Sequence, residues 1–168
     1  HNGKIWFTDT PNSKIGNFDP NTEEFEIIEI PPLTAKSQFS IPIALKVDFD
    51  NNIWIAVVDR NMLLMYNQDS KKFEKFLRLP TEESGPSALL IDDNGNIWFA
   101  EALSGKIGIV DSKTFEITEF APDTPLDEPF ALLFDKFGSL WISEHTAPGI
   151  AKFDPILETF DRVKATNP

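Results

Sequence analysis

The residue three positions after a tryptophan is acidic three times in this chain, at Asp9, Glu101 and Glu144. In the remaining copy Val57 takes this position and Asp59 lies two residues further on. Carboxylate oxygens are the ligands that Mg²⁺ and Ca²⁺ prefer, so acids gathered around one mouth of a central channel would form a cation site. The structural alternative is that each carboxylate accepts local hydrogen bonds and fixes the loop that follows it.

A second group of candidate residues surrounds the histidine that adjoins a carboxylate. Glu144 and His145 are neighbours, and Glu128 is expected in the same structural unit. Because a carboxylate and an imidazole can serve as acid and base, we predict Glu128, Glu144 and His145 as catalytic residues. Glu128 and Glu144 also join Asp9 and Glu101 as predicted metal ligands. Neighbours on a strand point to opposite faces, so the alternative for His145 is an exposed loop histidine.

The acids belong to an internal repeat with a period of about 45 residues. Each copy carries a tryptophan inside a short apolar run, at Trp6, Trp54, Trp98 and Trp141. Short β-type runs at this period are typical of propeller blades. We expect the tryptophans to pack between blades rather than to bind a sugar or a peptide.

Each complete repeat is interpreted as four strands. An apolar run that opens with proline precedes a tight turn and the tryptophan run, and a third run and an alternating apolar–charged run follow. Alternation indicates a strand with one face in water, which suits the outer rim of a blade. The stretches 48–52 and 92–96 contain the Asn and Gly residues that tight hairpins need, which favours turns over calcium loops there.

These patterns predict an all-β propeller with four visible blades of four antiparallel strands, forming a single domain over residues 1–168. The expected blades cover approximately residues 1–31, 41–80, 85–121 and 128–165. The first blade lacks its inner strand, so we expect the chain to be part of a larger ring. A compact four-bladed ring and a ring built from two chains are the alternatives.

Charge and composition exclude several classes of partner. The formal net charge of −12 argues against nucleic acid, because its phosphates would be repelled, and fits an acidic surface or the capture of cations. The chain contains no cysteine, which excludes disulfides and thiol chemistry. We expect no membrane span, since no apolar run is long enough. Extracellular, periplasmic and cytoplasmic locations all stay open.

The blade sequences resemble those of one known family. The segments IWFTDTPNSKIGNFDP and IWFAEALSGKIGIVDS are similar to blades of the streptogramin (virginiamycin B) lyases, within the wider group of NHL-repeat and gluconolactonase-like propellers. The resemblance implies a seven-bladed ring that opens cyclic depsipeptide antibiotics by elimination, with Mg²⁺, acidic residues and histidine. In the family pattern the key histidine follows Glu-Pro at the start of an inner strand.

The positions of this histidine in the chain hold Ile43, Ser87 and Phe130, each after a proline, and the glutamate of the pattern is retained only at Glu128. We therefore favour a binding or scaffold propeller without a complete catalytic site in this chain, with a small-molecule or protein ligand at the channel mouth. The alternative is a Mg²⁺-assisted carbon–oxygen lyase, or a lactonase-like hydrolase, completed by blades outside this chain. Mg²⁺ or Ca²⁺ is the expected cofactor, and a homodimer or a further propeller segment would complete the ring.

Overall fold

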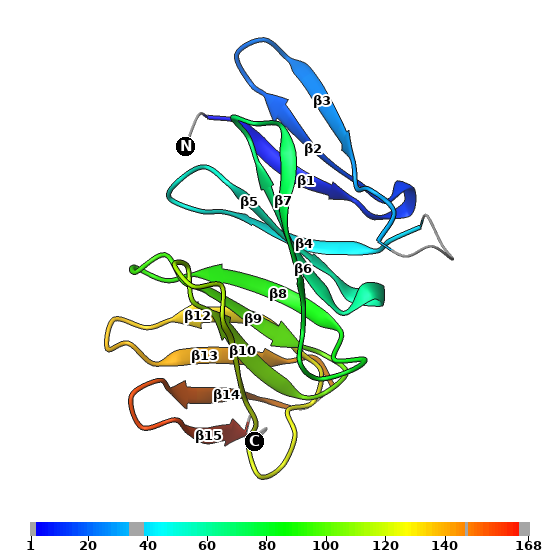
Figure 1. Ribbon diagram of the computed structural model, residues 1–168. Helices are drawn as coiled ribbons and strands as arrows, with labels where there is room; N and C mark the ends of the chain where they lie inside the picture. The colour runs from blue at the N-terminus through cyan, green and yellow to red at the C-terminus, as the bar shows by residue number, and fades with distance from the viewer. Residues whose placement is uncertain (1–2, 34–38, 147, 165–168) are drawn as a thin grey trace.

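The computed structural model describes residues 3–33, 39–146 and 148–164 as a stack of antiparallel sheets (Figure 1). Within these ranges, every regular element is a strand except two short 3-10 helices, η1 (Thr10–Asn12) and η2 (Val58–Arg60). No helix among these residues is long and apolar enough to cross a membrane. The all-β propeller architecture predicted from the repeat is confirmed.

Four sheets, numbered here as blades 1 to 4, follow one another along the chain. Blade 1 has three described strands, β1 (Ile5–Asp9), β2 (Lys14–Asp19) and β3 (Glu24–Glu29). Blade 2 contains β4 (Pro42–Val47), β5 (Ile53–Val57), β6 (Met62–Asn67) and β7 (Lys72–Arg78). Blade 3 contains β8 (Pro86–Ile91), β9 (Ile97–Glu101), β10 (Lys106–Val110) and β11 (Ile117–Phe120). Blade 4 contains β12 (Pro129–Phe134), β13 (Leu140–Glu144), β14 (Gly149–Asp154) and β15 (Thr159–Lys164).

Apolar clusters at the junctions between blades hold the stack together. Trp54 is buried in the cluster between blades 2 and 3, and Trp98 in the cluster between blades 3 and 4. A third cluster joins blades 1 and 2 around Ile15 and Ile55, and Trp6 packs against it. The core therefore lies between sheets, as expected for the period-fixed tryptophans.

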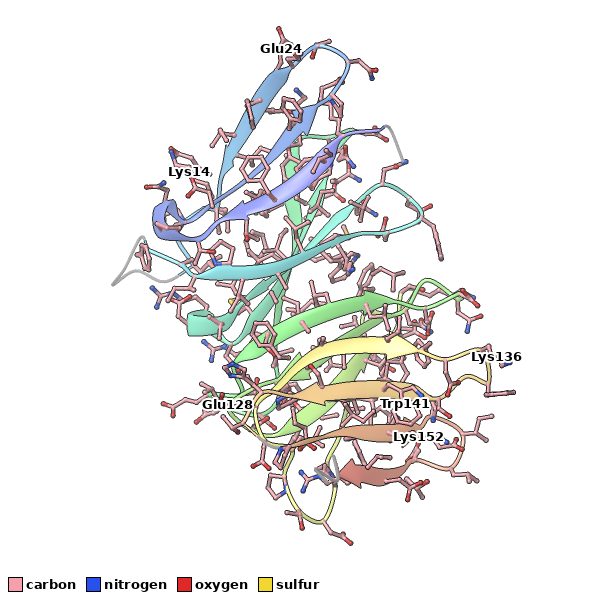
Figure 2. All side chains as sticks on the ribbon, turned by 180° about the vertical axis from the view of Figure 1, so that it is seen from behind. Lys14, Glu24, Glu128, Lys136, Trp141 and Lys152 are labelled. Atoms are coloured by element: carbon pink, nitrogen blue, oxygen red, sulfur yellow. The ribbon has the colours of Figure 1, made fainter. Side chains whose placement is uncertain are left out.

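Trp141 differs from the other tryptophans in its surroundings. Its side chain is only half-buried, because no further sheet in the described part of the chain covers that face of blade 4. The Lys152 ammonium lies 5.9 Å from the centre of the Trp141 ring (Figure 2). Among the described sheets, the Trp141 ring thus packs only against its own blade.

A tight turn joins the inner strand of each complete blade to its tryptophan strand. In blade 3, Asp92 Oδ1 accepts the backbone N–H groups of Asn94 and Asn96, both at 2.9 Å. Asp92 Oδ2 accepts the Asn96 side-chain amide at 3.1 Å and Trp98 Nε1–H at 3.1 Å. Gly95 adopts a positive φ of 85°, which glycine tolerates without strain. The stretch 92–96 is therefore a hairpin turn, as its composition indicates.

A large side chain lies opposite a small residue across the two middle strands of blades 3 and 4. Gly108 of β10 lies opposite Phe99 of β9, whereas Ala151 of β14 lies opposite Ile142 of β13. A Cβ atom added to Gly108 would lie 2.2 Å from the Phe99 ring. The glycine is thus required by the aromatic ring that covers it.

We expect Gly108→Ala to lower the free energy of unfolding by about 2 kcal/mol, because the added methyl group overpacks the Phe99 ring. Urea denaturation checks this value. The matched control adds Phe99→Ile, which reproduces the Ile142–Ala151 pair of blade 4 and should recover part of the loss. Equal losses in the single and double variants would contradict the steric explanation.

Candidate functional site

A carboxylate and an imidazole meet at one end of blade 4. Glu128 precedes β12, and His145 follows β13, which pairs with β12. His145 Nδ1 lies 3.1 Å from Glu128 Oε2, and the side chains are 70% and 50% exposed, respectively. The backbone N–H of His145 is bonded to the carbonyl oxygens of Asp127 and Glu128. The structure therefore brings together two of the three predicted catalytic residues, facing solvent.

This pair can work as a base with an orienting partner. When Nδ1 carries the proton, Glu128 accepts its hydrogen bond, and Nε2 keeps a lone pair that can accept a proton. Figure 2 shows Glu128 at the start of β12, at the opposite end of the blade from Lys136 in the β12–β13 turn. The pair and the turn are thus separated by the length of the strand.

An exposed aromatic side chain lies beside the pair. The Phe130 ring is 5.9 Å from the His145 ring with 34° between their planes, and Phe130 is 49% exposed. Phe130 occupies the position that is histidine in the Glu-Pro-His pattern of the streptogramin lyases. The imidazole of His145 comes from the end of the neighbouring strand and lies close to this position. Phe130 itself was not predicted as a functional residue.

Phe130 lies at an irregularity of the strand register that recurs in the repeat. The β12–β13 pairing shifts between Pro129 and Ala131, and the same shift follows Pro42 and Pro86 in blades 2 and 3. Such bulges re-aim the side chain that they contain. The recurring proline at the head of each inner strand is the sequence signal that could have drawn attention to the residue after it.

Glu144 does not join the pair, although it is adjacent to His145 in sequence. Its side chain is only 3% exposed, and its Oε1 accepts hydrogen bonds from Arg162 Nη2 at 2.9 Å and the Asp127 backbone at 2.8 Å. Arg162 also donates to the Pro125 carbonyl oxygen at 2.5 Å. Glu144 therefore holds the segment before β12 in place, which positions Glu128 indirectly.

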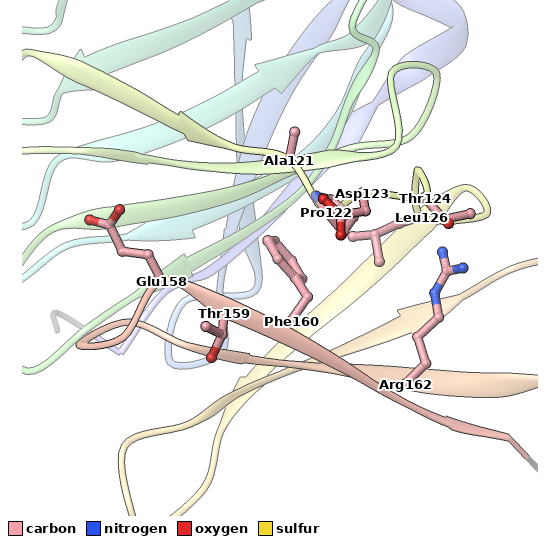
Figure 3. A pocket seen from close by; sticks show the side chains of 9 residues that line it. All are labelled: Ala121, Pro122, Asp123, Thr124, Leu126, Glu158, Thr159, Phe160 and Arg162. Atoms are coloured by element: carbon pink, nitrogen blue, oxygen red, sulfur yellow. The ribbon is translucent and has the colours of Figure 1, made fainter.

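Arg162 lines a cavity of about 470 Å³ between the segment after β11 and strand β15 (Figure 3). Figure 3 shows Phe160 on the same strand as Arg162, with Asp123, Thr124 and Leu126 on the segment that faces this strand. The guanidinium is already engaged with Glu144 and the Pro125 carbonyl. These contacts tie β15 of blade 4 to the segment that connects blades 3 and 4.

Glu101 is completely buried at the end of β9. Its Oε2 accepts a hydrogen bond from the Ser104 hydroxyl at 2.6 Å. Burial raises the pKa of Glu101 to about 7, and the neighbouring Glu119 charge acts in the same direction. Oε1 has no hydrogen-bond partner among the described residues. Protonation of this buried carboxyl group removes the cost of burying its charge, which is why burial raises its pKa.

Glu119 keeps its charge in this arrangement. Burial acts to raise its pKa, but hydrogen bonds from the Thr81 hydroxyl and amide outweigh burial and hold the pKa below its usual value. Lys106 Nζ lies 3.2 Å from Glu119 Oε2 and 2.6 Å from Thr81 Oγ1. The cluster of Glu101, Glu119, Lys106 and Thr81 thus ties blade 3 to the segment that precedes it.

Glu101 should make the stability of this protein depend on pH. The folded pKa lies above the unfolded value of 4.5, so its contribution is complete below about pH 4.5 and is lost as the pH rises to about 7. We expect the free energy of unfolding to fall by about 3 kcal/mol over this range through this group. Glu101→Gln removes the titrating group and should remove the dependence, as urea denaturation at several pH values can measure. Parallel pH profiles of the two proteins would contradict this assignment.

Asp9 makes a local contact of its own. Both carboxylate oxygens accept hydrogen bonds from the Asn12 side chain, at 2.9 and 3.0 Å, across η1. In blade 2, Asp59 Oδ1 accepts the Ile41 backbone N–H at 2.6 Å. Each acid after a tryptophan strand thus has a hydrogen-bond partner of its own. This favours the alternative in which these acids fix the loops rather than share a cation.

The predicted metal ligands Asp9, Glu101, Glu128 and Glu144 are therefore engaged separately. The described residues include no group of three or more His, Asp or Glu side chains that could hold a metal ion. Glu101 and Glu144 are buried with partners of their own, so they do not fit a shared ion in this arrangement. The binding of Mg²⁺ or Ca²⁺ stays a prediction. Glu128, whose side chain is 50% exposed, is the predicted ligand that an ion in solvent can best reach.

Comparisons with known proteins agree with the blade motifs. The family model described as the virginiamycin B lyase family matches residues 1–161. No curated protein matches the chain significantly. A selenomethionine-substituted virginiamycin B lyase from Staphylococcus aureus is 25% identical with a TM-score of 0.87, over 100% of this chain and 54% of that one. A streptogramin B lyase structure is 22% identical with a TM-score of 0.82, over 96% of this chain and 51% of that one.

A third solved structure has a ligand. It is a catalytically inactive histidine-to-alanine variant of virginiamycin B lyase from Staphylococcus aureus with quinupristin, 22% identical to this chain with a TM-score of 0.83. The match covers 99% of this chain and 53% of that one. The chain thus spans about half the length of these relatives. On the match over residues 1–161, this chain belongs to the virginiamycin B lyase family.

Proposed function

We propose that this chain is a ligand-binding part of a virginiamycin B lyase-family propeller, with its site formed by Glu128, Phe130 and His145. The observation that carries the proposal is the contact of an exposed aromatic ring with an exposed, hydrogen-bonded carboxylate–imidazole pair. Ligand sites combine apolar area with a few polar groups that fix orientation. Phe130 supplies the apolar face, and Glu128 and His145 supply the polar groups.

Neighbouring blades support the same location. The inner strands β4, β8 and β12 contact one another in order, so Ile43, Ser87 and Phe130 occupy equivalent positions at the same end of adjacent strands. Ser87 Oγ donates to the Pro129 carbonyl oxygen at 2.7 Å, which fixes the start of β12 against β8. Ile43 is 37% exposed. A ligand bound at Phe130 could therefore extend along this end of the stack.

Calorimetric titration of the chain with quinupristin, the ligand crystallised with a relative, tests the proposal. We expect Phe130→Ala and His145→Ala each to weaken binding about tenfold, which corresponds to about 1.4 kcal/mol. Phe137→Ala is the matched control, because Phe137 is 83% exposed in the turn at the other end of β12. No binding, or equal weakening by Phe137→Ala, would contradict the proposed site.

Base-catalysed ring opening is the second candidate function, and the Glu128–His145 hydrogen bond favours it. His145 Nε2 would take the proton from the carbon next to a carbonyl group, while Glu128 stabilises the imidazolium that forms. The electron pair would form a C=C bond as the alkyl–oxygen bond of the ester breaks and the ester leaves as a carboxylate. The divalent ion implied by the family resemblance would stabilise the charge that develops on the carbonyl oxygen, and Glu128 is its best placed ligand in this chain.

Liquid chromatography with fragmentation in the mass spectrometer separates the two candidates, because a linear isomer differs from the intact ring in its retention and its fragments. Elimination opens a ring without changing the mass, whereas hydrolysis adds one water molecule. Ring opening by the chain in the presence of Mg²⁺, with loss of activity of at least about a hundredfold in His145→Ala, would support the lyase. Binding without any product would support the binding module instead.

A further inference from the structure

Both peptide groups that flank Phe130 are held by serine side chains. On one side, the Pro129 carbonyl oxygen accepts a hydrogen bond from Ser87 Oγ of the neighbouring blade at 2.7 Å. On the other side, the Ala131 backbone N–H donates to Ser143 Oγ of strand β13 at 3.0 Å. Because peptide groups are planar, fixing these two groups fixes the φ and ψ angles of the residue between them. The direction of the Phe130 side chain follows from these angles.

The register of the β12–β13 pair leaves Phe130 without a partner of its own. Pro129 and Ala131 both have partners on β13, and the register shifts between them. A bulge of this kind interrupts the ladder of backbone hydrogen bonds, so the groups on either side of it depend on side chains for their partners. Without such partners the ring of the bulged residue would have no fixed direction.

The bulges of blades 2 and 3 lack this pair of contacts. The position of Ser143 holds alanine in both blades, Ala56 and Ala100, and alanine has no side-chain acceptor. The Pro42 carbonyl oxygen accepts a hydrogen bond from Thr10 Oγ1 at 2.6 Å, so the bulge of blade 2 is held on one side. Among the described blades, hydroxyl groups hold the bulge on both sides only in blade 4, where the bulged residue lies beside an imidazole.

The residue before the bulge also depends on its surroundings. Glu128 has a positive φ of 50°, a left-handed conformation that is unfavourable for residues with a Cβ atom. Such strain persists only where neighbouring contacts fix the backbone. The hydrogen bond from Ser87 to the next carbonyl group is one of these contacts. The Glu128 carbonyl oxygen accepts another from the His145 backbone N–H at 3.1 Å. The anchored backbone therefore orients both side chains that lie beside the imidazole.

We propose that Ser87 and Ser143 are positioning residues of the site formed by Glu128, Phe130 and His145. Their hydroxyl groups hold the two peptide groups around Phe130, so that its ring lies against the imidazole. A ligand then meets an ordered aromatic face and does not lose affinity through the ordering of that side chain. The effect of the serines on binding rests on the proposed function, whereas the orientation of the ring rests on contacts within the chain.

NMR of the chain without a ligand tests the orientation itself. The readout is the nuclear Overhauser effect between the Phe130 and His145 ring protons, because it reports the distance between the two rings. Ser143→Ala introduces the residue of blades 2 and 3 and should lower this signal by about half or more. Ser143→Thr introduces the residue that blade 1 has at Thr8, keeps the hydroxyl group and should preserve the signal. An unchanged signal in Ser143→Ala, or equal losses in the alanine and threonine variants, would overturn the proposal.

Calorimetric titration with quinupristin, the ligand crystallised with a relative, measures the consequence for binding. We expect affinity to fall about threefold in Ser143→Ala and about fivefold in Ser87→Ala, whose hydrogen bond is buried. Ser112→Ala, in the turn at the other end of blade 3, is the matched control and should bind like the unmodified chain. Unchanged affinity in both site variants would overturn the role of the two serines in binding. Absence of binding by the unmodified chain would contradict the proposed function alone, because the ring signal still decides the orientation.

Discussion

Replacing Arg162 by alanine is expected to lower the free energy of unfolding by about 3 kcal/mol. The Glu144 side chain is only 3% exposed, and Arg162 is its sole cationic partner in the described part of the chain, at 2.9 Å. Removal of one partner leaves a buried charge uncompensated, which is the costly case for ion pairs. Arg162 also loses its hydrogen bond to the Pro125 carbonyl oxygen. Urea denaturation at pH 7 measures the loss.

The matched control removes the charge that Arg162 compensates. Glu144→Gln in the Arg162→Ala background should recover more than half of the loss, because an amide needs no cationic partner and can still accept the Asp127 N–H hydrogen bond. A single-variant loss below about 1 kcal/mol, the range typical of exposed pairs, would contradict the assignment of this pair as buried.

Asp92→Ala is expected to lower the free energy of unfolding by about 3 kcal/mol. The carboxylate accepts four hydrogen bonds, from the backbone of Asn94 and Asn96, the Asn96 side chain and Trp98 Nε1. Hydrogen bonds to charged groups contribute more than neutral ones, and the partly buried indole N–H would lose its acceptor. Thermal or urea denaturation checks the loss.

Asp93→Ala is the control for this substitution, because Asp93 is the exposed neighbour in the same turn. We expect its effect to stay within about 0.5 kcal/mol, as for most surface substitutions. Similar effects of the two alanine substitutions would mean that the turn tolerates the loss of its acceptor. The repeated tryptophan–aspartate contact would then not be a stabilising feature of the blades.

The fold could be predicted from the sequence because the same strand pattern occurs in four successive copies. A tryptophan period of about 45 residues and the Asn- and Gly-containing turns indicate blades without any knowledge of long-range contacts. The structure bears out the interblade position of Trp54 and Trp98. Trp141 deviates, since its face of blade 4 lies open in the described part of the chain.

The candidate site could be predicted only in part. The alternation of side chains along a strand explains why Glu144 points into the blade while His145, the next residue, reaches Glu128 on the surface. The role of Phe130 depends on the shift of register after Pro129, which neither composition nor periodicity specifies.

The partners of the buried acids come from the outer strands and were not predicted. Glu119 lies opposite Gly108, and Arg162 lies opposite Ala151, at equivalent positions of blades 3 and 4. Glu119 and Arg162 come from the outer strands β11 and β15 of their blades. If these two strands are aligned in sequence, the same position is seen to face the acid at the end of each tryptophan strand, Glu101 in blade 3 and Glu144 in blade 4. The chemistry differs between the blades, with two acids close together in blade 3 and an ion pair in blade 4. It depends on the burial of these side chains, which the sequence alone does not give.

The most direct test of the proposed ligand site is aromatic ¹H–¹³C NMR of the chain during titration with a cyclic depsipeptide. We predict that the ring signals of Phe130 and His145 shift together and saturate, whereas those of Phe137, at the other end of β12, stay in place. Saturable shifts that spare Phe130 and His145, or no shifts at all, would contradict the assignment of this end of blade 4 as the binding site.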